Sequence, residues 1–326
     1  MRRLVITCLA ALVLTSCGTD RASDPLQVTD ELTAATPASS PPTTTQPAGT
    51  VRPSPPVQLT QYDPSTNTLV LASDSTLTLL DPRTNHQRTV QLPGQPAGLH
   101  TQNGHALAAL PEQNQVIHID LRTAQTRSTH VDGGPVHAIP LDDERLAVAL
   151  RDHKSVVVLQ AGKPTTTADN FEGPAQLLAS GNQIYVLDRL TTSLVPIDPA
   201  TGEKGPGLRV GQGATNAVTD RYDRILALDT RKGEFFAFST DPFIMKQRYP
   251  TPGHPYAIAY DSTRDLAWVT LTETNEVIAY DVAGGEPQER LRHPTVSQPN
   301  SIAVDPTTGH VYIASANGDG LQVITE

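Results

Sequence analysis

Histidine is the residue type here best suited to acid–base chemistry or metal binding, and its spacing indicates whether such a site is encoded. The chain has ten histidines, which are scattered singly, with no His-x-His pair and no His-Glu-x-x-His motif. A metal site needs several ligands at a spacing that lets them converge. The sequence also has no Gly-x-Ser-x-Gly elbow, no phosphate-binding loop and no dinucleotide fingerprint. We therefore expect no catalytic residue set, no metal and no cofactor.

Cys17 is the residue whose surroundings indicate a specific covalent chemistry. Arg2 and Arg3 form a positive segment, an apolar stretch too short to span a bilayer follows, and Leu-Thr-Ser-Cys ends at Cys17. This order resembles a bacterial lipobox, in which the leader is cut before a cysteine that carries a diacylglycerol. Cys8 leaves with the leader, so Cys17 has no disulfide partner. We expect a lipoprotein signal peptide at 1–16 and lipid attachment at Cys17; a plain secretory leader is the alternative.

The segment after the lipobox has the composition of a spacer. Residues 18–56 are dominated by Thr, Pro, Ala and Ser. They have too few apolar side chains to offset the entropy lost on ordering. We therefore predict that 17–56 is a disordered, solvated tether and that the folded domain is 57–326.

The charge of the chain excludes some partners. The formal net charge is -10 at pH 7, and the loss of Arg2 and Arg3 with the leader makes it more negative. Such a surface repels nucleic acid and anionic headgroups. We therefore expect no nucleic-acid partner, and attachment to the lipid bilayer only through an acylated Cys17.

Short motifs recur along residues 57–326 and determine the fold. A turn built around Gly and Pro returns at intervals of 39, 39, 40, 41 and 44 residues. Short apolar runs begin at Leu69, Ala106, Leu146, Ile184, Ile225, Ala267 and Val311. A four-stranded unit of this length cannot bury both faces alone, and seven in series solve this by packing radially into a closed ring. The sequence predicts an all-β fold: a seven-bladed β-propeller of four-stranded antiparallel blades.

Aspartate recurs at the turns of these units. It follows the third strand or the first strand of several repeats, at Asp81, Asp120, Asp198, Asp63, Asp261 and Asp305. An Asp at the first position of a turn accepts hydrogen bonds from backbone amides two residues on. We expect these aspartates to form turns and to have no catalytic role.

Two places depart from the regular repeat. The seventh unit has only three strands, so we expect a segment before Val57 to supply its outer strand, either near Thr50–Arg52 or near Leu26–Thr29. Pro196 falls inside the third strand of the fourth unit, where proline cannot donate a ladder hydrogen bond. We expect a bulge or an open sheet edge at Pro196.

The loops that such a ring gathers on one face are the place where a ligand site is expected. Loops after the second and fourth strands of each blade emerge on the same face, around the mouth of the central channel. The candidate ligand-binding residues there are His137, Gln176, Asn216, His254, Tyr256 and Asn300. Farther out, the loops between strands two and three contribute residues such as Glu112, Arg151, His153, Asp188 and Arg189. For each of these side chains, the alternative is an ordinary solvated loop residue.

The repeats resemble those of a known family. Strands such as Trp268-Val-Thr-Leu and Val311-Tyr-Ile-Ala precede a third strand that ends in Asp and a Gly-x-Pro turn. This pattern resembles YVTN-type, YncE-like propeller proteins and covers all seven repeats. The resemblance implies an exported binding or surface protein without one shared reaction. Gln160 replaces the terminal Asp in the third repeat, and Ala214 stands where a Pro is expected.

Together these features predict a membrane-anchored extracytoplasmic propeller that acts as a binding or scaffold protein in the cell envelope. Its partner would be an envelope protein, a peptide, a glycan or a small molecule bound at the loop-rich face. The alternative is a lactonase- or streptogramin-lyase-like enzyme with its site at the channel mouth. In that reading, His137 and His254 approach the channel from separate sides.

Overall fold

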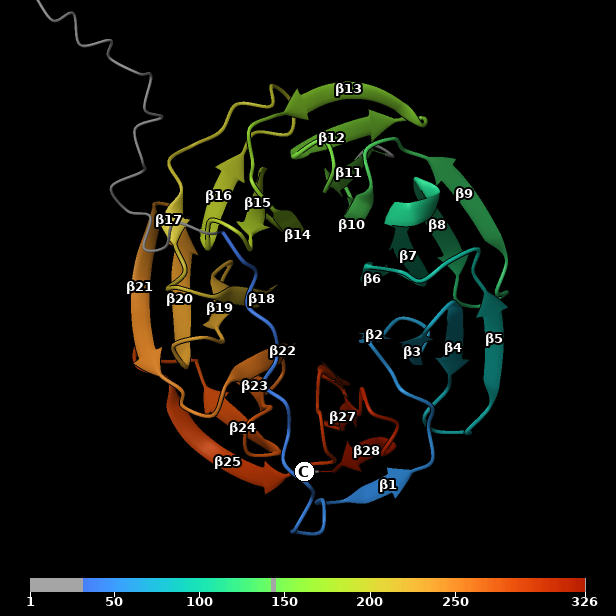
Figure 1. Cartoon of the computed structure of the whole chain (residues 1–326), viewed down its shortest axis with the longest axis vertical. Coiled ribbons are helices and arrows are strands. Elements are labelled where there is room, and N and C mark those ends of the chain that lie inside the picture. Colours follow the sequence, from blue (N-terminus) through green and yellow to red (C-terminus); the bar gives the residue numbers. More distant parts are fainter. Residues whose placement is uncertain (1–31, 142–144, 326) are drawn as a thin grey trace, which may run out of the picture. The chain divides into compact units, whose positions relative to one another are not determined.

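The computed structural model describes residues 32–141 and 145–325 as a seven-bladed β-propeller (Figure 1). Each blade is a sheet of four antiparallel strands, and the blades follow one another around a common axis. The predicted fold class is confirmed. The predicted signal peptide, Cys17 and the first part of the tether lie outside the described residues. No helix in the described part of the chain is long and apolar enough to cross a membrane.

The first three blades follow the repeat order of the sequence, from the innermost strand outward. Blade one contains β2 (Leu59–Asp63), β3 (Thr68–Ser73), β4 (Thr76–Leu80) and β5 (Gln87–Gln91). Blade two contains β6 (Gly98–Gln102), β7 (His105–Leu110), β8 (Gln115–Asp120) and β9 (Thr126–His130), with the 3-10 turn η1 (Pro111–Gln113) after β7. Blade three contains β10 (Pro135–Pro140), β11 (Arg145–Leu150), β12 (Ser155–Gln160) and β13 (Lys163–Ala168).

Blades four to six have the same order. Blade four contains β14 (Pro174–Ser180), β15 (Gln183–Asp188), β16 (Ser193–Ile197) and β17 (Leu208–Arg209). Blade five contains β18 (Ala214–Thr219), β19 (Ile225–Asp229), β20 (Glu234–Thr240) and β21 (Phe243–Pro250). Blade six contains β22 (Pro255–Asp261), β23 (Leu266–Leu271), β24 (Glu276–Asp281) and β25 (Gln288–Pro294).

Blade seven closes the ring with strands from both ends of the described chain. It contains β26 (Ser301–Val304), β27 (Val311–Ala314), β28 (Leu321–Ile324) and, as its outer strand, β1 (Thr50–Arg52). β1 pairs antiparallel with β28, with Val51 opposite Gln322. This confirms the nearer of the two predicted closing segments; the other, Leu26–Thr29, lies outside the described residues.

The hydrophobic core lies between neighbouring blades. Val70 and Leu77 of blade one pack with Ala106 and Leu110 of blade two. Trp268, 1 % exposed, belongs to a cluster shared by blades six and seven. Strands covered on both faces read as continuous apolar runs, which is why each repeat shows a run without alternation. The blades therefore depend on one another for burial, as expected for a closed ring.

The turn aspartates behave as the sequence indicates, and Pro196 does so only in part. The Asp81, Asp120 and Asp198 carboxylates accept hydrogen bonds from the amides two residues on, at 2.9, 2.8 and 2.7 Å. Pro196 pairs with Tyr185 on its inner side without a bulge. On its outer side, β17 pairs only with Ser193 and Leu194. Beyond β17, the Gly205 amide donates to the Pro196 carbonyl at 2.9 Å, and Ile197 forms an isolated bridge with Lys204. The outer side of Pro196 is therefore irregularly paired, with neither the predicted bulge nor a fully open edge.

Residues 32–49, which we call the strap, correct the predicted boundary of the tether. They run across the loops of blades four to seven and lead into β1 (Figure 1). The Ala48 amide donates to the Pro294 carbonyl at 3.0 Å, and Gln322 Nε2 donates to the Ala48 carbonyl at 2.8 Å. This part of the predicted solvated tether is therefore bound to the propeller, because polar groups of the loops satisfy its main chain.

Candidate functional site

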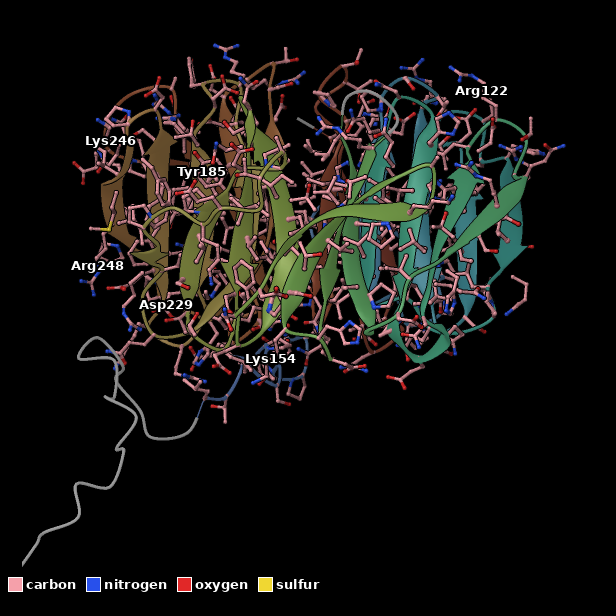
Figure 2. The ribbon with its side chains drawn as sticks, turned by 90° about the horizontal axis from the view of Figure 1, so that it is seen from above. Arg122, Lys154, Tyr185, Asp229, Lys246 and Arg248 are labelled. Carbon is pink, nitrogen blue, oxygen red and sulfur yellow. The ribbon has the colours of Figure 1, made fainter. Side chains whose placement is uncertain are left out.

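The loops between second and third strands and the loops between consecutive blades share one face, which we call the mouth face. Lys154 lies on this face together with the strap, whereas Arg122 lies on the opposite face (Figure 2). The strap covers the mouth face over blades four to seven, and we call this the covered half. The loops of blades one to three form the open half. The predicted ligand-binding face is therefore partly occupied by the chain itself.

Two arginines hold the start of the strap. Arg189, in the loop after β15, donates from Nη2 to the Ala35 carbonyl. Arg231, in the loop after β19, donates from Nη2 to the Thr33 carbonyl at 3.1 Å. Ala35 is 4 % exposed, and a methyl group added at Gly213 would meet its Cβ at 3.0 Å. The loop therefore approaches Ala35 closely because residue 213 has no side chain.

Thr272 and Gln298 bind the middle of the strap. The Ala38 amide donates to Thr272 Oγ1 at 3.0 Å, and Ser40 Oγ donates to the Thr272 carbonyl at 2.6 Å. Gln298 Nε2 donates to the Ala38 carbonyl at 2.8 Å, and Gln298 Oε1 accepts from the Ser40 amide at 3.1 Å. Most of these contacts reach the main chain of the strap. The covered half thus recognises an extended backbone rather than large side chains.

The open half carries exposed ion pairs between blades. Arg151 Nη1 lies 3.1 Å from Glu112 of blade two and Arg151 Nε lies 2.8 Å from Asp152. Lys154 Nζ lies 2.6 Å from Glu172, which precedes blade four. These side chains are between 46 and 71 % exposed. Exposed pairs of this kind contribute little to stability, so they leave charged groups available to a partner.

Three of the predicted site residues connect inner strands. The His137 ring accepts at Nδ1 from the Leu177 amide at 3.3 Å. Gln176 donates to the Ala217 carbonyl at 2.8 Å and accepts from the Ala217 amide at 3.0 Å. Asn216 Nδ2 donates to the Tyr256 carbonyl at 2.7 Å, so each side chain reaches the backbone of the next blade.

A repeated irregularity of the inner strands places these side chains. The pairing of β10, β14 and β18 with their second strands shifts register close to His137, Gln176 and Asn216. A bulge redirects side chains relative to the regular pleat. The three polar groups form a series of links between blades three to six and do not converge on one pocket. Their role in ligand binding stays a prediction.

His137 is held in its neutral form. Its side chain is buried, and this burial, with the nearby His100, lowers its pKa to about 3. The two rings lie 6.2 Å apart in an edge-on arrangement. Burial lowers the pKa of His100 as well. A neutral imidazole that accepts at Nδ1 carries its proton on Nε2.

The other predicted residues lie beside the strap. His254 Nδ1 is 3.0 Å from Glu273 Oε2, with the two side chains 40 and 56 % exposed. Asn300 Oδ1 accepts from Gln298 Nε2 at 2.9 Å, which also binds the strap. Tyr256 is partly buried against the apolar cluster of blades six and seven. The structure therefore brings His254 and Asn300 close to residues that bind the strap.

Asp188 and Asp229 hold the loops that carry these groups. Asp188, 1 % exposed, accepts from the amides of Glu172, Gly173, Leu190 and Thr191 at 2.8 to 3.0 Å. Asp229, fully buried, accepts from the Gln212 and Lys232 amides at 2.7 and 3.0 Å. Buried carboxylates satisfied in this way fix the loops rigidly. Asp188, predicted as a loop residue of the ligand-binding face, therefore holds the loops around it in place.

No group of three or more His, Cys, Asp or Glu side chains within residues 32–141 and 145–325 is arranged to hold a metal ion. The residues that sequence reasoning missed are those of the strap and its receptors Thr272 and Gln298, whereas its receptor Arg189 was predicted as a loop residue of this face. A composition of Thr, Pro, Ala and Ser carries no apolar signal, since the strap is bound through backbone groups. Only the buried Ala35 resembles a core residue.

The fold is shared with solved structures of diverse proteins. Hydrazine synthase of Kuenenia stuttgartiensis matches with a TM-score of 0.71 at 15 % identity, over 86 % of this chain and 99 % of that chain. A streptogramin B lyase structure matches with a TM-score of 0.69 at 14 % identity, over 85 % and 96 %. The β-propeller domain of Swd1 from Myceliophteria thermophila matches with a TM-score of 0.71 at 12 % identity, over 85 % and 99 %.

These likenesses show the fold alone. No protein-family model and no curated protein matches the sequence. Because enzymes and non-enzymatic domains share this architecture, the function has to be argued from the loops and side chains.

Proposed function

We propose that this protein is a membrane-anchored extracytoplasmic binding or scaffold protein, whose partner docks on the open half of the mouth face. The lipobox-like sequence supports acylation of Cys17 and a position on the outer side of the bacterial cell membrane. The resemblance to YncE-like propellers supports the same reading, since that family consists largely of exported binding or surface proteins.

The observation that carries the proposal is the strap itself. The mouth face already binds an extended segment of protein through its main chain, with Gln298 and Thr272 as the central receptors. The open half has loops of the same kind, and their charged groups are exposed in inter-blade pairs. An interface with exposed charges of both signs suits a protein partner, which it orients by charge complementarity.

The test is site-specific crosslinking in intact cells. A photoreactive p-benzoylphenylalanine at His153 probes the open half, and the same residue at Arg122 probes the opposite face; both positions are exposed. We expect a defined crosslinked partner from position 153 and none from position 122. Equal crosslinking from both positions, or crosslinking from position 122 alone, would contradict docking on the open half.

The anchor is tested separately. Cys17→Ser removes the acceptor thiol, so the protein should lose metabolic labelling with palmitate and leave the membrane fraction. The matched change Ser16→Ala keeps the thiol and should retain both. Unchanged fractionation of the Cys17→Ser variant would refute lipid attachment at this residue without touching the proposed binding face.

A second candidate function is a lyase of the streptogramin type, favoured by one observation. His254 and Glu273 form an acid–base pair 3.0 Å apart on the mouth face, and a streptogramin B lyase has the same fold. General acid–base catalysis needs a pair within hydrogen-bond distance of each other and of a substrate. Turnover of a streptogramin B by the purified protein, lost in His254→Ala, would favour the enzyme over the binding protein.

A further inference from the structure

A groove between blades two and three opens on the side of the ring opposite the mouth face. Its volume is about 750 Å³, within the range of roughly 300–1,000 Å³ that small-molecule sites occupy. Its rim includes the turn after β6 and the turn between β12 and β13, which belong to the same face as Arg122 (Figure 2). A Cβ added at Gly162, in the second of these turns, would meet no atom within 4 Å. The rim is therefore open, and the groove is separate from the strap.

A histidine in this groove stands where other blades have an apolar residue. The fourth residue of the third strand faces the next blade, and in blades one, three, five and six it belongs to the core between blades: Leu79, Val158, Ala237 and Ala279. In blade two this residue is His118, which is partly buried and lines the groove. Val116, two residues earlier on the same face, still packs with blade three. The apolar core between blades two and three therefore ends before His118, and the groove begins there.

The two walls of the groove differ in chemistry. Blade two contributes polar side chains, with His118 opposite Arg127 in the pairing of β8 and β9. His118 Nε2 also lies 3.1 Å from Thr129 Oγ1. Blade three contributes mainly apolar side chains, namely Pro140, Leu141, Leu146 and Leu159. A ligand with a polar end and an apolar body therefore meets a suitable surface on each side.

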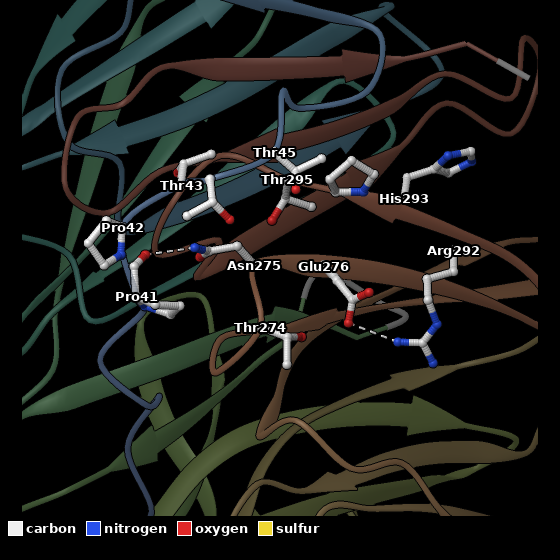
Figure 3. Close-up of a pocket in the computed structure, with 12 residues that line it drawn as sticks. Pro41, Pro42, Thr43, Thr45, Thr274, Asn275, Glu276, Arg292, His293 and Thr295 are labelled. Carbon is white, nitrogen blue, oxygen red and sulfur yellow. Dashed lines mark hydrogen bonds and ion pairs between the residues drawn. The ribbon is translucent and has the colours of Figure 1, made fainter.

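Arg127 forms no ion pair with a described residue. In blades five and six, arginines of the outer strand pair with carboxylates of the third strand, Arg248 with Glu234 at 2.8 Å and Arg292 with Glu276 at 3.0 Å (Figure 3). The residue opposite Arg127 is a histidine instead, and the arginine is exposed. A guanidinium binds an oxyanion through two parallel N–H···O hydrogen bonds. Arg127 is therefore available to the anionic group of a ligand.

The electrostatics of the groove agree with this assignment. Burial lowers the pKa of His118 to about 4, and the nearby Arg127 and His105 add to this shift because they disfavour a further positive charge. Asp120 is the one carboxylate among the described lining residues, and its Oδ1 accepts from two amides of its own turn at 2.8 Å. Arg145, the other arginine of the lining, already has a partner. Arg127 is thus the cation left for a ligand.

We propose that this groove binds a small amphipathic carboxylate, with Arg127 on the carboxylate and the leucines of blade three against the apolar body. The site lies on the face opposite the strap and the open half. It therefore does not depend on the proposed partner-binding function, and either can fail without the other.

The experiment measures binding of dansylglycine, an aromatic carboxylate, to the full-length protein by titration calorimetry. Dansylglycinamide has the same apolar body without the charge and should bind at least about fivefold more weakly. Arg127→Gln removes the cation and should weaken dansylglycine binding by a similar factor, whereas Arg127→Lys keeps the charge and should lose less affinity. Arg83→Gln changes an exposed arginine in a turn of blade one and is the matched control, with unchanged binding expected.

A second variant tests the apolar wall. Leu141→Gln makes a partly buried position of blade three polar and should weaken dansylglycine binding about threefold. Loss of affinity in both Arg127→Gln and Leu141→Gln would place the ligand between the two walls. Absence of saturable dansylglycine binding, equal affinity for dansylglycinamide, or unchanged affinity in Arg127→Gln would overturn the proposal. Thermal unfolding of each variant shows that the comparison is made on folded protein.

Discussion

In blade three, Arg151 pairs with the carboxylates of Glu112 and Asp152, and its side chain stays 47 % exposed. In blades four and five, Arg189 and Arg231 stand in the corresponding loops but donate to carbonyls of the strap. Corresponding loops thus hold an ion pair in the open half and a peptide segment in the covered half. The difference teaches that loops of one kind can form either exposed ion pairs or hydrogen bonds to the main chain of the strap.

The largest loss of stability is expected when the strap and β1 are forced away from blade seven. Gly49 has a φ of +72°, and a side chain there would collide with the Val323 carbonyl of β28. Gly49→Val should lower the free energy of unfolding by about 3 kcal/mol. Denaturant unfolding measures this. Gly284→Val, where an added Cβ meets no atom within 4 Å, is the control and should be nearly neutral.

Loss of a buried carboxylate that holds a loop of the covered half should lower stability more than loss of an exposed carboxylate in the open half. Asp229→Asn replaces a fully buried acceptor of the Gln212 and Lys232 amides, and should destabilise the protein by about 2 kcal/mol. Asp152→Asn, in the open half, changes an exposed carboxylate and should cost less than about 0.5 kcal/mol. Equal losses in thermal or urea unfolding would remove this difference between the halves.

Low pH should destabilise the contact between blades three and four, where the open half meets the covered half and His137 accepts from the Leu177 amide. Its pKa is about 3 in the folded protein and about 6.5 when unfolded, because burial disfavours the charged ring. The unfolded state therefore binds more protons between these values, and stability falls as the pH falls below 6.5. The loss is about 1.4 kcal/mol at pH 5.5 and grows with further acidification.

His100, whose pKa burial also lowers, contributes in the same direction. His137→Gln keeps a polar group but has no titrating ring, so its stability should depend less on pH between 6.5 and 5. Urea unfolding at several pH values measures the two slopes. The same slope in the variant and the unchanged protein would show that His137 is not the titrating group.

The smallest expected effect separates docking of the strap from global stability. Gln298→Ala removes two side-chain hydrogen bonds to the strap, one to the Ala38 carbonyl and one from the Ser40 amide, and lies outside the apolar core. Proteinase K should cleave the strap about fivefold faster, as expected for roughly 1 kcal/mol of local stabilisation. Lys154→Ala, which breaks an exposed pair in the open half, should leave that rate unchanged.

The ring itself was accessible from the sequence because its determinants are local and repeated. Apolar runs recur in every unit with a period near 40 residues, and turn aspartates recur in most units, so an error in one unit does not alter the fold. The closing strand at Thr50–Arg52 was also predictable, because blade seven lacks an outer strand of its own. Pro196 indicated where β16 loses its regular pairing with β17, because a proline nitrogen cannot donate a hydrogen bond.

The site was harder to predict from the sequence than the fold, because its contacts join residues that lie far apart along the chain. Gln176 and Asn216 are polar residues at the start of inner strands, and the sequence does not say whether they face the axis or the next blade. The bulges decide this, and they depend on pairing between strands. The strap was missed for a related reason: its docking depends on loop side chains more than 150 residues away.

Docking of the strap also sets how far the propeller can stand from a lipid anchor. If Cys17 is acylated, a free chain up to residue 56 would allow a standoff of about 130 Å at 3.3–3.6 Å per residue. Fixing the chain at Leu32 leaves only the residues from 18 to 31, whose contour length is about 50 Å. An anchored propeller could then reach only partners that lie within about 50 Å of the bilayer.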